Sequence, residues 1–588
     1  MGCYLKAKTI QGPERTIAAY ILRSTGMKML FRVEFGLCAC ILFTVTSSVS
    51  GRQDPVSEWK SASSRPNVLF LVVDDLRPKL GCYGETNMVT PNIDQLAASS
   101  VRFDRAYVQF ALCGPSRTSF LTSRRPESTR VFNLYTYWRD VAGNYTTLPQ
   151  HFKQSGYITQ SVGKVFHPGK SSGGDDDYPL SWTNKPYHGD KGGNSGYKNN
   201  SEQCPGPDGK LHDYAVCPVN VSQTPHKILE DIDLADFSVD FLKNYRHKYQ
   251  DQPFFFAVGF HKPHLIWKYP VEYEALYPLT HITLPKDKTK PEGMPPVAWY
   301  TCTGLREHQD IMDVNFPFPY GPLPDDMILK IRQAYSASTS YVDAQIGRVL
   351  SALDQYGYAN NTIITFIGDH GWNLGEHGEW CKQTNFELAV RIPYLVHVPN
   401  VTSRFRQRGH NFPFIDALHP KQVQKVSDAG LHLSTDVIVE AVDLYPTISE
   451  LAGVDVPSRC PLNGYNTAFC TEGSSLVSIL KNLTTAAPVQ WENIAYSQYP
   501  RWSPDPHKGS PSVTIMGYTL RNPEYRYTEW VYYNHTAYTM DWTQLYGREL
   551  YVHTTDPAED NNVAAQSAYQ AVVEQLSKQL HQGIENRE

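Results

Sequence analysis

The chain has 588 residues, of which 41% are hydrophobic and 19% are charged, and its formal net charge at pH 7 is −5. This length allows one large domain with a smaller one, and this composition excludes a disordered or a membrane-embedded chain. The weak negative charge excludes a general nucleic-acid-binding surface, so an anionic substrate would have to meet local groups of Arg and Lys.

Residues 1–50 have the pattern of a leader and signal peptide. A basic stretch that begins at Met27 precedes an apolar run and a cluster of small residues that ends near Ser50, as in an export signal. Residues 1–26 do not resemble the beginning of such a signal, which makes Met27 an alternative start. The apolar run is shorter than a bilayer requires, so we expect a secreted protein with no stable membrane anchor.

Glycosylation motifs and paired cysteines agree with export. The Asn-x-Ser/Thr motifs lie at Asn144, Asn199, Asn220, Asn360, Asn400, Asn482 and Asn534. Their number is typical of a secreted glycoprotein. Cys204 with Cys217, and Cys460 with Cys470, lie close together in loop-rich sequence, so we expect two local disulfides. Cys113 has no such neighbour.

Several apolar runs have the length of buried strands, and polar residues follow each of them. The runs and the residues after them are 67–73 with Asp74 and Asp75, 254–260 with His261 and His264, and 362–368 with Asp369 and His370; the segment 156–169 repeats the pattern with Lys164 and His167. Such runs are typical of parallel strands covered by helices on both faces. Because ligands bind at the carboxyl ends of strands in such sheets, the clusters predict one composite site.

Helical signals lie between these runs. Thr90 before Pro91 predicts a capped helix start, and residues 443–453 predict a helix that ends at a glycine. This alternation indicates an α/β class. Residues 170–225 and 285–326 are rich in Gly, Asn, Asp and Pro and predict long irregular segments.

The character of the sequence changes near residues 482–490. Short aromatic strands are expected at 525–534 and 549–557, and an amphipathic helix at 564–583. We therefore divide the chain into a leader (1–50), a main domain (51–484) and a C-terminal subdomain with a small antiparallel sheet and a terminal helix (485–588).

The pair Asp74-Asp75 fits either a solvated turn or a cation site. The expected proximity of Asp369 favours a cation, since three clustered carboxylates repel one another unless a positive charge neutralises them. Hard oxygen ligands select Ca²⁺ or Mg²⁺ over zinc, although the imidazole of His370 is a softer ligand than these ions prefer.

The residues alone leave the role of Cys113 open among an inert thiol, a disulfide half and a nucleophile. A tyrosine-phosphatase loop needs five residues between Cys and Arg, whereas three separate Cys113 from Arg117. A papain-like thiol would leave the carboxylates unexplained. For the basic residues that follow, Arg124, Arg125 and Arg130, we expect a solvated basic stretch.

The stretch "CGPSR" at 113–117 with "LT" at 121–122 resembles the sulfatase signature Cys-x-Pro-Ser-Arg-x-x-x-Leu-Thr-Gly. Further segments resemble sulfatase motifs in the expected order, namely "TPNIDQLA" (90–97), "VGKVFHPG" (162–169), "HKPH" (261–264) and "GDHGWNLGEHGEWCK" (368–382). Ser123 stands where the family usually has glycine. The resemblance implies the alkaline-phosphatase-like sulfatase fold, in which a large, mixed, mostly parallel sheet covered by helices carries the catalytic site and a smaller C-terminal α+β subdomain follows.

In this family a formylglycine-generating enzyme converts the signature cysteine to formylglycine, whose hydrate attacks the sulfate ester and forms a sulfated-enzyme intermediate. The resemblance therefore implies the following roles: Cys113 becomes the formylglycine; Asp74, Asp75, Asp369 and His370, with residue 113, bind Ca²⁺; Arg117, Lys164 and His167 position the hydrate; Lys164, His264 and Lys382 bind the sulfate; and His264 protonates the leaving alcohol. Cys381, next to Lys382, is a second thiol to which the resemblance assigns no role.

A narrower likeness lies in residues 340–354, 495–501 and 516–531. These segments resemble lysosomal sulfatases that remove the 2-O-sulfate of L-iduronate from the non-reducing ends of heparan sulfate and dermatan sulfate. The alternatives are a sulfatase for another sulfated sugar, a relative that hydrolyses phosphate esters, and an inactive glycosaminoglycan-binding protein. Relatives that hydrolyse phosphate esters usually have Ser or Thr at the position of Cys113, and a binding protein would need no such set of residues.

Overall fold

The computed structural model describes residues 65–189, 204–206, 208–224, 226–402, 411–419, 433–461, 467–485, 489–504 and 511–585, and the backbone of two short strands nearer the N-terminus. The chain divides into an N-terminal unit, Met1–Arg52, and a large unit, Gln53–Glu588. In the N-terminal unit β1 (Lys6–Ile10) pairs antiparallel with β2 (Ile17–Ile21). The remainder of the expected leader, and Asn199, lie outside the described residues. None of the described helices is long and apolar enough to cross a membrane.

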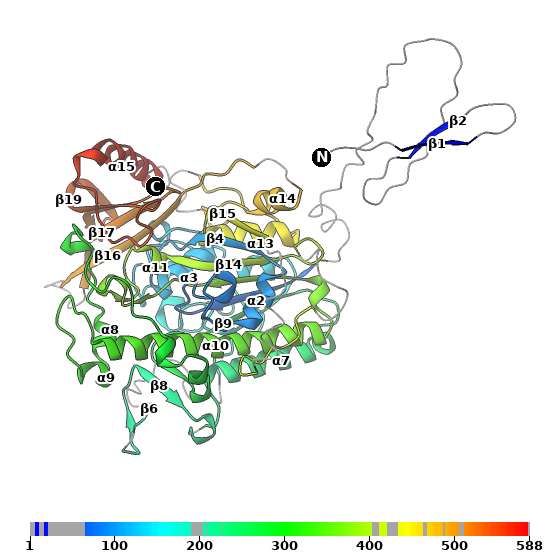
Figure 1. Cartoon of the computed structure of the whole chain (residues 1–588), viewed down its shortest axis with the longest axis horizontal. Coiled ribbons are helices and arrows are strands. Elements are labelled where there is room, and N and C mark those ends of the chain that lie inside the picture. The colour runs from blue at the N-terminus through cyan, green and yellow to red at the C-terminus, as the bar shows by residue number, and fades with distance from the viewer. Residues whose placement is uncertain are drawn as a thin grey trace, which may run out of the picture. The chain divides into compact units, whose positions relative to one another are not determined.

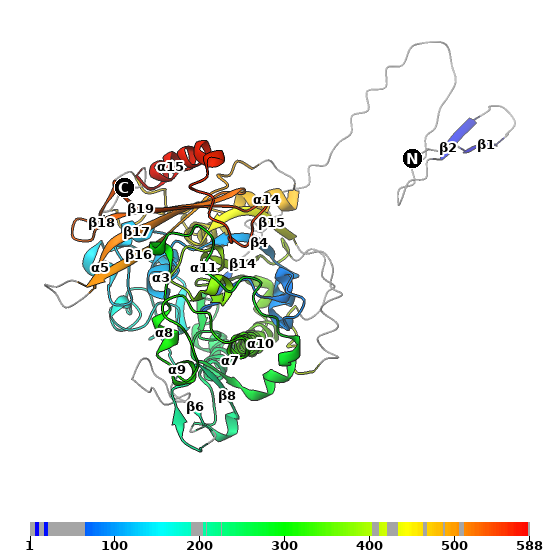
Figure 2. The same cartoon turned by 60° about the vertical axis from the view of Figure 1, so that its left-hand side comes forward.

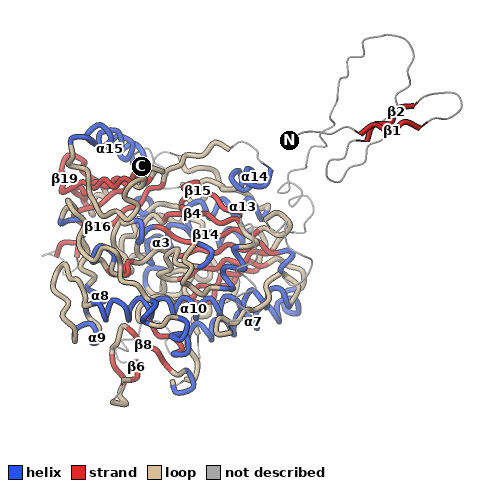
Figure 3. Tube along the Cα trace, in the orientation of Figure 1, coloured by secondary structure: helices blue, strands red, loops and turns tan. Residues whose placement is uncertain are grey.

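A seven-stranded sheet lies at the centre of the large unit (Figures 1 and 3). Its strands, in spatial order, are β15 (Leu433–Glu440), β4 (Val101–Tyr107), β14 (Arg391–His397), β11 (Thr362–Gly368), β3 (Asn67–Val73), β9 (Phe254–Phe260) and β5 (Ile158–Gly163). β14 is antiparallel to both of its neighbours, and all other pairs are parallel. The predicted mixed, mostly parallel sheet is therefore confirmed.

Three central strands coincide with the apolar runs of the sequence. β3, β9 and β11 are buried at every position. β3 pairs in parallel with β11 on one side and with β9 on the other, and β5 is the next strand beyond β9 in the sheet. The polar residues after these strands consequently meet at one edge of the sheet.

Helices cover both faces of the sheet, as Figures 1 and 2 show. Successive side chains of β3 alternate between two apolar cores. Leu69, Leu71 and Val73 pack in one core, which is covered by α2 (Pro91–Ala97), α7 (Glu230–Tyr249) and α10 (Asp325–Gln355). Val68, Phe70 and Val72 pack in the other, beside α3 (Cys113–Thr122), α6 (Leu148–Gln154) and α13 (Leu444–Ala452).

The remaining elements of the main domain are short. The helices are α4 (Pro126–Thr129), α5 (Trp138–Val141), α8 (Thr303–Arg306), α9 (Gln309–Met312), α11 (Glu387–Val390) and α14 (Val477–Thr485), and the strands are β6 (Cys204–Pro205), β7 (Leu211–His212), β8 (Val216–Val219), β10 (Trp267–Pro270), β12 (Asn373–Leu374) and β13 (Trp380–Cys381). The helix expected after Thr90 is present, but the Thr90 side chain does not cap it. Thr90 Oγ1 instead accepts a hydrogen bond from Gly81 N (3.0 Å).

The C-terminal part contains a four-stranded antiparallel sheet and a final helix. The elements are β16 (Ala495–Pro504), β17 (Pro511–Arg521), β18 (Tyr525–Asn534), β19 (Thr539–Val552) and α15 (Gln570–Glu585). α15 buries Val573, Leu576, Leu580 and Ile584, at the spacing of one helix face. The predicted antiparallel sheet and terminal helix are confirmed, whereas the boundary at 484/485 stays a prediction.

The cysteines form one disulfide more than we predicted. Cys204–Cys217 and Cys460–Cys470 are bonded as expected. The third disulfide joins Cys381 to Cys302, 79 residues away in the sequence, so Cys381 is not a thiol. Of the described cysteines, Cys82 and Cys113 are free.

The prediction of a solvated stretch is wrong for Arg124 and Arg125, because the chain turns inward after α3. Arg125 Nη1 donates to Glu440 Oε1 (2.8 Å), and both side chains are almost completely buried. The guanidinium of Arg124 lies 4.3 Å from the centre of the Tyr145 ring.

Ser123 ends α3 in the left-handed conformation, with φ +49°. Ser123 Oγ donates to Val442 O (2.6 Å) and accepts from Gly473 N (3.2 Å). Glycine adopts this conformation without strain, which explains its usual occurrence here. In this chain the two buried hydrogen bonds offset the strain of the serine backbone.

We expect Ser123→Ala to destabilise the protein by about 1–3 kcal/mol, because it keeps the strained conformation and leaves two buried backbone groups without a partner. Ser123→Gly should cost less, since it relieves about 1 kcal/mol of strain. Thermal midpoints measured for the three proteins should fall in the order parent, Ser123→Gly, Ser123→Ala. Equal midpoints for Ser123→Ala and the parent would show that the hydrogen bonds are not stabilising.

Candidate active site

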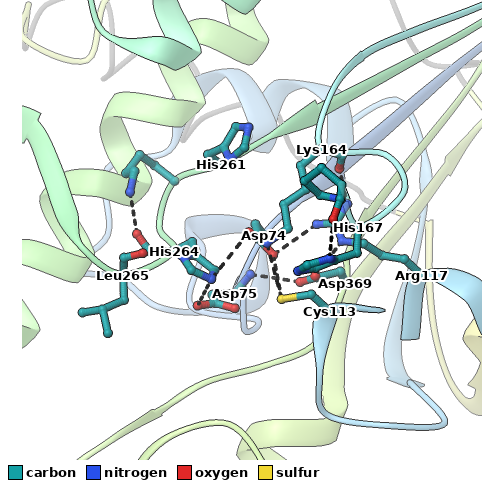
Figure 4. Close-up of polar contacts among 12 residues, drawn as sticks. Asp74, Asp75, Cys113, Arg117, Lys164, His167, His261, His264, Leu265 and Asp369 are labelled. Carbon is teal, nitrogen blue, oxygen red and sulfur yellow. Dashed lines mark hydrogen bonds and ion pairs between the residues drawn. The ribbon is translucent and has the colours of Figure 1, made fainter. Parts of the chain in front are cut away.

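The side chains at the ends of the central strands converge on the sulfur of Cys113 (Figure 4). Cys113 is the first residue of α3 and is 2% exposed. Its Sγ lies 3.4 Å from Asp74 Oδ1, 3.3 Å from His370 Nε2, 3.3 Å from Lys382 Nζ and 3.5 Å from Lys164 Nζ. The structure thus brings together residues that follow three different strands, as the sequence predicted.

The Cys113 thiol is poorly suited to act as a nucleophile itself. Burial and the neighbouring Asp74 carboxylate raise the pKa of Cys113 to about 12, despite the nearby lysines. A thiol must lose its proton to attack, and at this pKa it stays protonated at neutral or acidic pH. The raised pKa of Cys113 therefore disfavours the papain-like interpretation.

Arg117 lies one helical turn after Cys113 and is completely buried. Its Nη2 donates to Asp74 Oδ1 (3.1 Å), its Nε to Asp369 Oδ2 (2.9 Å), and its Nη1 to Val165 O (3.1 Å). One guanidinium group therefore joins the ends of β3 and β11 to the loop after β5. This planar group makes several hydrogen bonds in fixed directions, which a lysine could not reproduce.

Four side chains form a cluster with the geometry of a cation site. Asp74, Asp75, Cys113 and His370 each place one ligand atom within 4.8 Å of the others. Asp369 adjoins them, with its Oδ2 3.4 Å from His370 Nε2 and its Oδ1 accepting from Asp75 N (3.0 Å). Carboxylate oxygens dominate this set, which suits a hard divalent cation.

Unsatisfied charge in the cluster supports this interpretation. Asp75 Oδ2 is buried and accepts no hydrogen bond from the described residues, an arrangement that costs free energy unless a ligand occupies it. Burial raises the pKa of Asp75 to about 6 and that of Asp369 to about 7. Burial would also raise the pKa of Asp74, but Lys164 and His264 hold it well below its usual range. A divalent cation would stabilise the first two carboxylates as anions.

Two lysines line the same space. Lys164 Nζ lies 2.5 Å from Asp74 Oδ2, and Lys382 Nζ lies 2.5 Å from Asp75 Oδ1. Both ammonium groups also approach Cys113 Sγ, so they could hold an anion next to that atom. Lys382 follows the two-residue strand β13 and no apolar run, so only the family resemblance indicated its position.

The two predicted histidines occupy different environments. His264 Nε2 lies 3.9 Å from the nearest oxygens of Asp74 and Asp75, and its side chain is 31% exposed. It therefore lies between the acidic cluster and solvent. His167 is more deeply buried, and its Nδ1 faces Pro168 O at 3.0 Å. Burial and the charge of Lys164 lower the pKa of His167 to about 3, and burial holds the pKa of His264 well below its usual range, so both rings are neutral without a bound anion.

The sequence did not identify Asp231 as part of the site. Asp231 lies in the first turn of α7, and its carboxylate accepts hydrogen bonds from His261 N (2.8 Å) and Lys262 N (3.0 Å). It thereby fixes the loop that carries His264. A single acidic residue at a helix start is too common to have signalled this contact.

Comparison with known proteins identifies the class of this protein. The family model described as Sulfatase matches residues 66–454, and the chain belongs to the sulfatase family. Members of this family are sulfuric ester hydrolases that in general depend on formylglycine and bind a metal ion. The predicted family and its fold are therefore confirmed.

Its similar relatives include iduronate 2-sulfatases. The protein of that name from Mus musculus is 44% identical over 534 residues, covering 89% of this chain and 95% of the relative, and the one from Homo sapiens is 44% identical over 530 residues, covering 88% and 94%. The solved structure of a protein in complex with its substrate D-glucosamine-2-N,6-O-disulfate is similar in fold. Its TM-score is 0.59 at 22% identity, and the match covers 89% of this chain and 98% of that chain.

Proposed function

We propose that this protein is a lysosomal sulfatase that hydrolyses the 2-O-sulfate ester of L-iduronate at the non-reducing ends of heparan sulfate and dermatan sulfate. The main structural support for sulfate-ester hydrolysis is the position of Cys113, whose Sγ lies within 3.5 Å of two lysine ammonium groups and an aspartate. The choice of substrate is supported by the 44% identity to iduronate 2-sulfatases over most of the chain.

The mechanism requires two groups beyond the encoded side chains. The formylglycine-generating enzyme would convert Cys113 to an aldehyde, whose hydrate supplies a hydroxyl that attacks sulfur, and Ca²⁺ held by Asp74, Asp75, Asp369 and His370 would supply positive charge beside it. The second hydroxyl of such a hydrate, which a serine would lack, would lose its proton, re-form the aldehyde and release inorganic sulfate.

The lysines and Arg117 provide the fixed electrostatic part of the site. The Nζ atoms of Lys164 and Lys382 bind sulfate oxygens and favour the negative charge that develops on them. Arg117 holds Asp74 and Asp369 in place, so the acidic cluster keeps its geometry as charge moves.

His264 is placed to act as the general acid. Its ring is partly exposed to solvent, and its Nε2 lies 3.9 Å from the nearest oxygens of Asp74 and Asp75. The negative charge of a bound sulfate ester raises the pKa of His264, and the proton that its Nε2 then holds passes to the leaving alcohol oxygen as the bond to sulfur breaks. His167, which is neutral, positions the group at residue 113.

The substrate is tested with defined disaccharides. Protein made in cells that contain the modifying enzyme should release sulfate from a terminal 2-O-sulfated iduronate. Cys113→Ala should lower the rate at least about 10³-fold with little change in thermal midpoint, because the nucleophile is lost and the fold is kept. Release of sulfate from glucosamine N-sulfate or 6-sulfate, but not from 2-O-sulfated iduronate, would contradict the assignment.

The calcium site is tested by thermal unfolding. Chelation should lower the thermal midpoint, and Ca²⁺ at about 100 times its Kd should restore about 2.7 kcal/mol of stability. Asp75→Asn should lose this dependence, since it removes a ligand charge, whereas Asp208→Asn at an exposed loop should keep it. The calcium site would be refuted if chelator and Ca²⁺ left the thermal midpoint of the parent unchanged, or if they shifted the midpoint of Asp75→Asn as much as that of the parent.

A further inference from the structure

Lys382 lies between two residues that are both tied to other parts of the chain. On its N-terminal side, Cys381 forms the disulfide with Cys302. On its C-terminal side, Gln383 N donates to Ala111 O (3.1 Å), two residues before Cys113. The backbone that carries the Lys382 ammonium group is thus held on both sides.

Arg501 joins the same two segments as the disulfide. Its Nη1 donates to Gln383 O (3.1 Å), while its Nη2 donates to Ala298 O (2.6 Å) and its Nε to Val297 O (2.8 Å). A further bond runs in parallel, from Tyr300 N to Glu379 Oε1 (2.9 Å). The loop 297–302 is therefore connected to residues 379–383 by the disulfide, by the hydrogen bonds of Arg501 and by the hydrogen bond between Tyr300 and Glu379.

The chemistry of Arg501 suits a structural connection better than substrate binding. All its described hydrogen bonds go to backbone carbonyl oxygens. Its guanidinium lies 4.6 Å from the centre of the Trp530 ring and 5.6 Å from that of Tyr499. It thereby connects β16 of the C-terminal sheet to the loop that carries Lys382.

The backbone around Lys382 needs such support. Cys381 has φ +70° and Gln383 has φ +77°. Residues other than glycine adopt this left-handed conformation at a cost, and keep it only where surrounding contacts enforce it. Without the disulfide and Arg501, the segment would relax and Lys382 Nζ would move away from its position 3.3 Å from Cys113 Sγ.

We infer that the Cys302–Cys381 disulfide and Arg501 together form a clamp that positions the Lys382 ammonium group for binding the sulfate of the substrate. This inference rests on the sulfate-binding role of Lys382 in the proposed function. The clamp residues are positioning residues, because they hold the segment and do not themselves reach the Cys113 sulfur.

The first test compares two disulfides in the full-length protein. Cys302→Ala with Cys381→Ala should weaken the binding of inorganic sulfate, measured by calorimetry, and raise KM for the sulfated substrate, each at least about tenfold. The matched control, Cys204→Ala with Cys217→Ala, removes another buried disulfide and should leave both values within about twofold of the parent. Equal effects of the two pairs would overturn the inference.

Arg501→Lys tests the clamp with all disulfides intact, so the inference can be tested even if the variant without Cys302 and Cys381 does not fold. Lysine keeps the charge but cannot bond both segments at once, so sulfate binding should weaken by about the same factor. In a Lys382→Ala background, neither clamp change should weaken sulfate binding further. The clamp would be contradicted if Arg501→Lys bound sulfate as tightly as the parent. It would also be contradicted if either clamp change weakened sulfate binding further in the Lys382→Ala background.

Measuring the binding of inorganic sulfate tests this inference independently of the proposed substrate. A parent protein that releases no sulfate from 2-O-sulfated iduronate would contradict the proposed function. The calorimetric comparison would still decide whether the clamp acts through Lys382, because it uses inorganic sulfate alone.

Discussion

The structure depends on the burial of three carboxylates side by side at the ends of two neighbouring parallel strands. Asp74, Asp75 and Asp369 are fully buried, and such a cluster is stable only if positive charge surrounds it. Arg117, Lys164 and Lys382 supply part of that charge, and Asp75 Oδ2, which accepts no hydrogen bond from the described residues, is available to a cation. The same lysines lie within 3.5 Å of Cys113 Sγ, so in the proposed function they both stabilise the carboxylates and bind the sulfate ester.

The C-terminal subdomain contributes to this site without supplying a reacting group. Arg501 on β16 and the disulfide at Cys381 both act on the short segment that carries Lys382. Because catalytic groups must be held to within a fraction of an ångström, distant contacts of this kind affect the chemistry through position alone. Through the inferred clamp, the C-terminal sheet takes part in sulfate binding as well as in packing.

The sequence predicted those features that depend on local patterns. The apolar runs became central strands because burial on both faces requires continuous hydrophobic residues, and the acids after them met because the strands are parallel neighbours. Cysteines 13 residues apart, Cys204 and Cys217, paired as expected. The link between Cys302 and Cys381 could not be predicted, since contacts across 79 residues of irregular sequence leave no local signal. The position of Lys382 came only from family resemblance.

The most direct test of the central claim is the mass of the tryptic peptide 106–117, which contains residue 113, in active protein purified from cells with the modifying enzyme. We predict a peptide lighter than the cysteine form, by the change of thiol to aldehyde, in an amount that rises with specific activity. Fully active protein that carries only unmodified Cys113 would contradict the account.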